Sequence, residues 1–177
     1  IMFIPMFILG ICIQSNNESF GYMQGKGDLI IGILLGLVFG VMLHELAHTC
    51  ACLSYKGYLF EIGVGTTFFL PMGYVLLEDG HIKNKFKRVQ IYAAGIEMNL
   101  LLYGVFMFLA SIEFINPFIM YLVAAENLGM AIINAMPLGI FDGLKILSTI
   151  LGKENLLIDA KNWIKHWNMT KEQHSVK

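Results

Sequence analysis

Apolar residues fall in long blocks along the 177-residue chain, and polar or glycine-rich segments separate them. Residues 29–53, 89–110 and 118–136 are each long enough for a helix that crosses roughly 30 Å of hydrocarbon at about 1.5 Å per residue. Residues 1–13 are as apolar but too short to cross alone, and we interpret them as the remnant of a longer helix. The pattern therefore predicts three transmembrane helices and a partial N-terminal one.

The apolar segment 54–78 has a different pattern, which predicts a β-hairpin. It contains five glycine or proline residues with β-branched and aromatic residues between them. Non-helical backbone at membrane depth is tolerated only against protein or a water-filled cavity. We therefore expect a membrane-associated hairpin, whose edge can pair with an extended peptide by strand addition.

The chain closes with a short helix and an amphipathic tail. Pro137 and Gly139 end the third apolar block, residues 144–151 resume as an apolar helix, and residues 153–177 mix basic and aromatic side chains suited to a membrane interface. The fold class predicted is an all-α membrane protein with three core helices, the partial N-terminal helix, the small hairpin and an amphipathic C-terminal helix. Its parts are an N-terminal apolar segment and external loop (1–28), a core (29–151) and a cytoplasmic tail (152–177).

Composition agrees with a membrane location, because 56% of residues are hydrophobic and 14% are charged, against about a quarter charged in soluble domains. The net charge of −1 gives no reason to expect nucleic acid as a partner. Three cysteines without a paired spacing predict no disulfide.

The 12 Lys and Arg residues are distributed unevenly, which predicts the orientation of the helices. Their numbers are five in residues 54–89, six after Asp142, one in residues 14–28 and none in residues 111–117. Loops rich in Lys and Arg stay in the cytoplasm. We therefore expect the C-terminal ends of the first and third spans on the cytoplasmic side.

A metal-binding pattern, His44-Glu45-Leu46-Ala47-His48, lies in the last third of the first span. Residues at i and i+4 share a helix face, so both imidazoles can reach one metal ion. Glu45 can then take a proton from a water that the metal activates. Charged and metal-liganding groups are energetically costly in an apolar span, so their presence there indicates a function.

A hydrolytic zinc site needs a third protein ligand and an open position for water. Asp142 is the preferred candidate, because the predicted topology brings it to the same cytoplasmic end as the two histidines. Cys52 shares their helix face, but ligands at i, i+4 and i+8 spread over about 12 Å. Glu97 and Glu126, both within spans, stay open as alternatives.

Four stretches together resemble the site-2 protease family of intramembrane zinc metalloproteases. They are residues 44–48 for its zinc motif, 71–75 for its membrane-reentrant hairpin, 93–99 for its Gly-x-x-x-Asn motif, and Asn134 to Pro137 with Asp142-Gly143 for its Asn-x-x-Pro…Asp-Gly motif. The similarity covers about residues 29–151, and it corresponds to a minimal core with no PDZ or CBS domain.

This resemblance implies one Zn²⁺ ion, and it also implies the roles of individual residues. The zinc ligands would be His44, His48 and Asp142. Glu45 would be the general base, and Asn134 would bind the substrate backbone or the oxyanion. Asn99 would bind substrate from the second span. Both asparagines are also compatible with hydrogen bonding between helices.

The resemblance further implies a transmembrane or membrane-associated protein as substrate and a multi-pass protein of a prokaryotic cell membrane with its active site towards the cytoplasm. The lipid bilayer is then a partner, and a second copy or a regulatory membrane protein is compatible with the family. Two other hypotheses stay open. One is a membrane protein that binds or transports zinc without proteolysis, and the other is a protease that trims soluble peptides.

Overall fold

The computed structural model of the chain describes residues 3–16, 25–67, 70–113, 115–153 and 156. In chain order the elements are α1 (Phe3–Asn16), α2 (Lys26–Ser54), β1 (Tyr58–Thr67), β2 (Leu70–Glu78), α3 (Lys85–Ser111), α4 (Pro117–Ala135) and α5 (Asp142–Leu151). Three helices, α2, α3 and α4, are long and apolar enough to cross a membrane. The mostly helical fold with one small hairpin is as predicted, and the predicted amphipathic C-terminal helix with its tryptophans lies outside the described residues.

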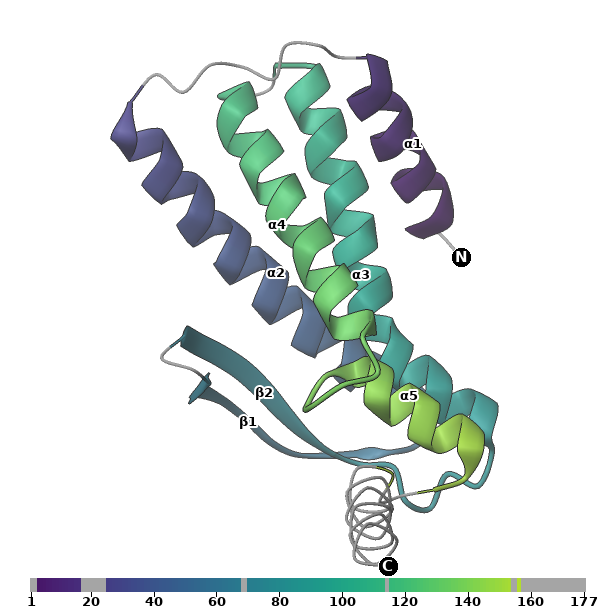
Figure 1. Cartoon of the computed structure of the whole chain (residues 1–177). Coiled ribbons are helices and arrows are strands. Elements are labelled where there is room, and N and C mark those ends of the chain that lie inside the picture. Colours follow the sequence, from purple (N-terminus) through teal and green to yellow (C-terminus); the bar gives the residue numbers. More distant parts are fainter. Residues whose placement is uncertain (1–2, 17–24, 68–69, 114, 154–155, 157–177) are drawn as a thin grey trace, which may run out of the picture.

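The three long helices pack side by side, and α1 lies along α3 (Figure 1). The hairpin and α5 lie at one end of this bundle, where α2 ends and α3 begins (Figure 1). Fully buried side chains hold the helices together, and among the largest are Tyr103, Ile91, Met107, Val123, Asn99 and Asn127. Two of these are amides, so polar groups as well as apolar ones occupy the centre of the bundle.

Side-chain caps set where two of the long helices begin. The Asn84 side chain accepts hydrogen bonds from the backbone N–H groups of Phe86 and Lys87, at 2.9 and 3.3 Å. The Asn116 side chain accepts one from Phe118, and Pro117 occupies the first turn of α4. As a result, α3 starts at residue 85 rather than at the predicted 89, and part of the basic cluster lies on its first turn.

Glycines allow α2 and α4 to approach each other closely. Gly32, Gly36 and Gly40 are buried and recur every four residues, so they form one stripe along α2. A β-carbon on these glycines would meet Leu122, Glu126 and Met130 of α4, respectively. Small residues at such interfaces let helices pack closely where lipid removes the hydrophobic driving force.

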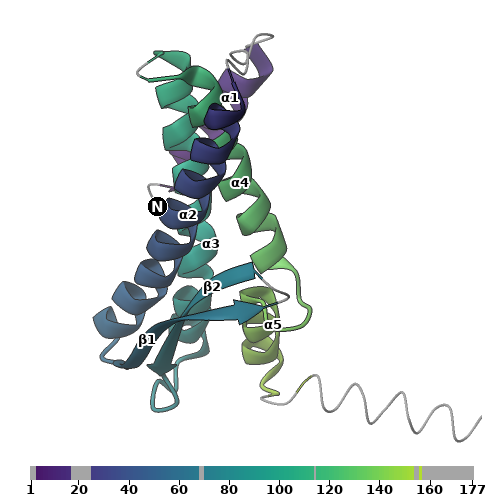
Figure 2. The same cartoon turned by 90° about the vertical axis from the view of Figure 1, so that its left-hand side faces the viewer.

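The hairpin pairs β1 with β2 in antiparallel register, with Val64 opposite Gly73 and an irregularity between Leu59 and Glu61. The strands lie across the lower end of the bundle in Figure 2. A β-carbon at Gly73 would lie 2.7 Å from Val41 Cγ1 and 3.4 Å from Glu45 Cγ. The missing side chain therefore lets β2 lie directly against the histidine-bearing part of α2.

Candidate metal centre

Helix α2 presents His44 and His48 on one buried face, one turn apart. Each residue is 5% exposed, and the two ring centroids are 4.7 Å apart with their planes at 82°. The four-residue spacing of an α-helix accounts for this shared face. The pattern read from the sequence is therefore formed as predicted.

Asp142 is the first residue of α5 and is also 5% exposed. Gly143 accounts for its position, because a β-carbon there would overlap the backbone carbonyl oxygens of Ala135 and Met136. Only glycine allows the start of α5 to lie this close to the end of α4. The Asp-Gly pair thus delivers a carboxylate from the third span towards the first.

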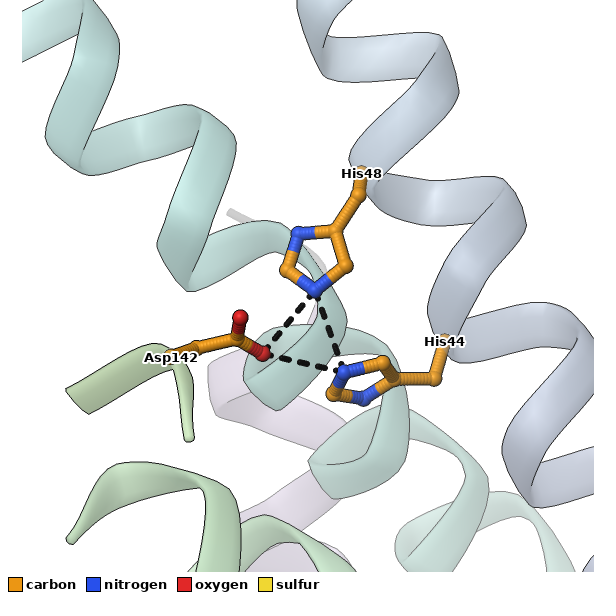
Figure 3. Close-up of side chains that lie close together, drawn as sticks. All are labelled: His44, His48 and Asp142. Atoms are coloured by element: carbon orange, nitrogen blue, oxygen red, sulfur yellow. Dashed lines mark hydrogen bonds and ion pairs between the residues drawn. The ribbon is translucent and has the colours of Figure 1, made fainter. Parts of the chain in front are cut away.

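The two imidazoles and the carboxylate point at one another (Figure 3). Asp142 Oδ2 lies 3.1 Å from His44 Nε2 and 3.0 Å from His48 Nε2, and the two nitrogens are 3.1 Å apart. This buried group of three can hold a metal ion. In the described part of the chain, Cys52, Glu97 and Glu126 do not belong to it.

Hydrogen bonds on the far side of each ring fix the imidazoles. His48 Nδ1 donates to the carbonyl oxygen of Ile91 at 2.7 Å, so the neutral ring keeps a lone pair on Nε2. His44 Nδ1 lies 3.1 Å from Asn99 Nδ2. Metal-ligating histidines generally have such a partner on the second ring nitrogen, since it sets the tautomer and the ring orientation.

The Asn99 amide supports the same assignment for His44. The residue is 0% exposed, and its Oδ1 atom has no hydrogen-bond partner in the described structure. A half-turn of the amide brings Oδ1 to His44 Nδ1, where it accepts a hydrogen bond from Nδ1–H. That exchange satisfies the unpaired oxygen and leaves the lone pair of His44 on Nε2.

Gly95 keeps the space beside the three ligand atoms open. A β-carbon at this position would lie 2.5 Å from both His44 Nε2 and His48 Nε2. Gly95 is the glycine of the Gly-x-x-x-Asn stretch, and its close contact is with the imidazoles of α2. The surrounding residues therefore fit a metal ion: ligand nitrogens, a carboxylate and a space that a methyl group would fill.

Charges near Asp142 favour its ionised form. Burial raises the pKa of the Asp142 carboxyl group. When the histidine Nε2 atoms carry protons, their hydrogen bonds to Asp142 and the charges of His48 and Lys145 outweigh burial and lower this pKa overall. Lys145 Nζ lies 3.2 Å from Asp142 Oδ1, the oxygen that faces away from the histidines. Asp142 thus offers Oδ2 as an anionic ligand atom.

The other predicted site residues occupy different surroundings. Glu45 is half-buried, and its carboxyl group interacts electrostatically with His44, His48, Asp142 and Lys145. Asn134 lies in the last turn of α4 and is partly exposed. Asn99, predicted to bind substrate, lies behind His44 and is fully buried. Substrate binding by Asn99 and Asn134 stays a prediction.

Three contributions to the site were not predicted from the sequence: those of Lys145, of Gly95 beside the imidazoles, and of the Ile91 carbonyl. Lys145 is three residues after Asp142 on a helix, a spacing that suggests an ion pair. Gly95 is four residues before Asn99 and so shares its helix face. The contribution of the Ile91 carbonyl cannot be predicted from the sequence, because every residue has a backbone carbonyl.

No family model, curated protein or solved structure matches this chain.

Proposed function

We propose that this protein is an intramembrane zinc metalloprotease that hydrolyses peptide bonds in transmembrane or membrane-associated substrates. One observation carries the proposal: a buried His44, His48 and Asp142 group, with Glu45 beside it, at the end of three helices long enough to cross a membrane. The resemblance of the four sequence motifs to site-2 proteases supports the same conclusion.

The donor set suits zinc in a hydrolytic site. Two imidazoles and one carboxylate leave a fourth position for water or substrate. Ligand atoms around a tetrahedral zinc ion lie roughly 3.3–3.6 Å apart, given metal–ligand distances of about 2.0–2.2 Å. The three separations of 3.0 and 3.1 Å are close to this value. Zinc bound here would supply a Lewis acid that polarises water and the substrate carbonyl.

Glu45 is the general base in this proposal. It follows His44 directly and lies near both histidines and Asp142, so its carboxylate can accept a proton from the attacking water. The same group then returns the proton to the leaving amine. Asn134, on the partly exposed last turn of α4, is available to donate a hydrogen bond to the substrate carbonyl oxygen.

The hairpin supplies a place for the substrate backbone. The peptide bonds of a transmembrane helix are hydrogen-bonded internally, so the substrate must unwind before it is cut. Gly73 places β2 directly against Glu45, the proposed base. An unwound segment that pairs with the free edge of this hairpin would satisfy its own N–H and C=O groups beside the site.

The proposed location is a prokaryotic cell membrane, with the site towards the cytoplasm.

Replacement of Glu45 by Gln tests this proposal, because it removes the base and keeps the size of the side chain. Purified Glu45→Gln protein should cleave a model transmembrane substrate at least roughly 100-fold more slowly than the unaltered chain. Its zinc content, measured by elemental analysis, should stay at one ion per chain. Glu97→Gln is the matched control, since it changes a carboxylate of α3 that lies outside the metal group, and it should cleave normally.

Cleavage at an undiminished rate by the Glu45→Gln protein would overturn the assignment. Zinc flux into proteoliposomes that persists in this variant, with no proteolysis in the unaltered protein, would instead support the transport hypothesis.

A further inference from the structure

A basic cavity of about 560 Å³ lies between α5 and the beginning of α3, next to the candidate metal centre, with which it shares Lys145. Half of its ten lining residues are cations, and none is acidic. The cations are Lys83, Lys85, Arg88, Lys145 and Lys153. The Tyr92 ring and the Thr149 side chain of α5 also line it.

Among the described residues, most of this positive charge is not paired with carboxylates. Arg88 pairs with Asp79 at 3.3 Å, and Lys145 pairs with Asp142 at 3.2 Å. Lys83, Lys85 and Lys153 have no acidic partner in the part of the chain that the structure describes. Three uncompensated ammonium groups around one cavity attract an anion, and low-dielectric walls focus that attraction.

The surroundings indicate that the anion belongs to a lipid. The cavity lies at the first turn of α3, one of the helices able to cross a membrane. Exposed apolar residues neighbour its lining residues in the chain: Phe86 follows Lys85, and Ile150 and Leu151 stand between Thr149 and Gly152. Phe86 is 68% exposed, Ile150 58% and Leu151 53%. A phospholipid has this combination of groups, a charged phosphate joined to apolar chains. A soluble phosphate compound has no apolar chains that could contact these exposed side chains.

We propose that this cavity binds the headgroup phosphate of an anionic phospholipid at the cytoplasmic membrane surface. The lysines contact the phosphate, and the acyl chains lie along the exposed apolar side chains of α3 and α5. The proposal requires the membrane location but not proteolysis. Basic pockets between membrane helices on the cytoplasmic side bind the headgroups of anionic lipids in other membrane proteins.

Native mass spectrometry of the full chain in detergent tests the proposal. The probes are short-chain phosphatidylglycerol, short-chain phosphatidylcholine and inorganic phosphate. Phosphatidylglycerol should be retained at the lowest concentration of the three. The double variant Lys83→Gln/Lys153→Gln should weaken its retention by roughly tenfold or more, since each cation near a membrane surface contributes substantially to anion binding.

The double variant Lys56→Gln/Lys87→Gln is the matched control, because it removes two charges that do not line the cavity. It should retain phosphatidylglycerol like the unaltered chain, and Lys83→Arg/Lys153→Arg should do so as well. Equal weakening in the control pair would overturn the proposal, since it would show only a diffuse surface charge. Equal retention of phosphatidylcholine, or of inorganic phosphate, would overturn the assignment to an anionic lipid.

Discussion

At the scale of single residues, the candidate metal centre is a cluster of acceptor atoms held close together. His48 Nδ1 donates its hydrogen bond to the Ile91 carbonyl, so the lone pair of the neutral ring is on Nε2. This Nε2 atom lies 3.0 Å from Asp142 Oδ2 and 3.1 Å from His44 Nε2. Acceptors at this distance repel one another unless a proton or a metal cation lies among them. We therefore expect the partners behind each ring to contribute to metal affinity without contacting the metal.

Asn99 provides a test of this idea. Asn99→Leu removes the partner of His44 Nδ1 without a large change in volume, and zinc affinity should fall by roughly 10- to 100-fold. Asn99→Asp keeps an acceptor for Nδ1–H and should bind zinc like the unaltered protein. Competition with a zinc-chelating dye measures both affinities.

The same pair of variants separates two roles for Asn99. If Asn99 binds substrate and does not orient His44, then Asn99→Leu will bind zinc normally and lose only cleavage. Circular dichroism should show that the variant is folded, so that a loss of zinc cannot be attributed to a loss of structure.

At the scale of elements, the join between α4 and α5 positions the third ligand. The backbone carbonyls of Ala135 and Met136 occupy the space where a side chain on Gly143 would be. Backbone atoms at a helix end cannot move aside as a flexible side chain does, so α5 and Asp142 would have to shift.

We therefore expect Gly143→Ala to reduce zinc affinity at least roughly tenfold and to lower the free energy of unfolding by about 1–3 kcal/mol. Isothermal titration with zinc and thermal unfolding in detergent measure the two effects. Gly129→Ala in α4 is the control, because a β-carbon there meets no atom within 4 Å. Unchanged zinc binding by the Gly143 variant would show that Asp142 does not depend on this close contact.

Much of this arrangement was predictable because it depends on periodicity. The three long helices, the hairpin and the pairing of His44 with His48 follow from apolar blocks, glycine spacing and the i, i+4 rule. Asp142 could be chosen over Glu126 by topology, since only Asp142 reaches the same end of the bundle. What could not be predicted involves contacts between elements, such as the position of Asn99 behind His44.

Side-chain capping accounts for the boundary that was misjudged. Residues 85–88 are too polar for an apolar span, so hydropathy places the start of α3 at 89. The Asn84 cap starts the helix four residues earlier. The consequence is a basic first turn that faces α5, and it forms one wall of the cavity described above.

At the scale of the whole molecule, the uneven distribution of Lys and Arg predicts how the bundle crosses the membrane. Residues 54–89 and the segment after Asp142 carry 11 of the 12 Lys and Arg residues, and the connection between α3 and α4 carries none. From the positive-inside rule we expect the candidate metal centre and the basic cavity on the cytoplasmic side.

Cysteine labelling in cells checks this orientation, after Cys12, Cys50 and Cys52 are replaced by Ala. A membrane-impermeant maleimide should label Glu113→Cys, at the α3–α4 connection, in intact spheroplasts. Lys83→Cys, beside the start of α3, should react only after permeabilisation, because the membrane shields cytoplasmic residues from the reagent. Both positions are exposed in the folded protein, so burial does not protect either. The reverse labelling pattern would place the metal centre on the outer face, and substrates would then have to be presented from outside the cell.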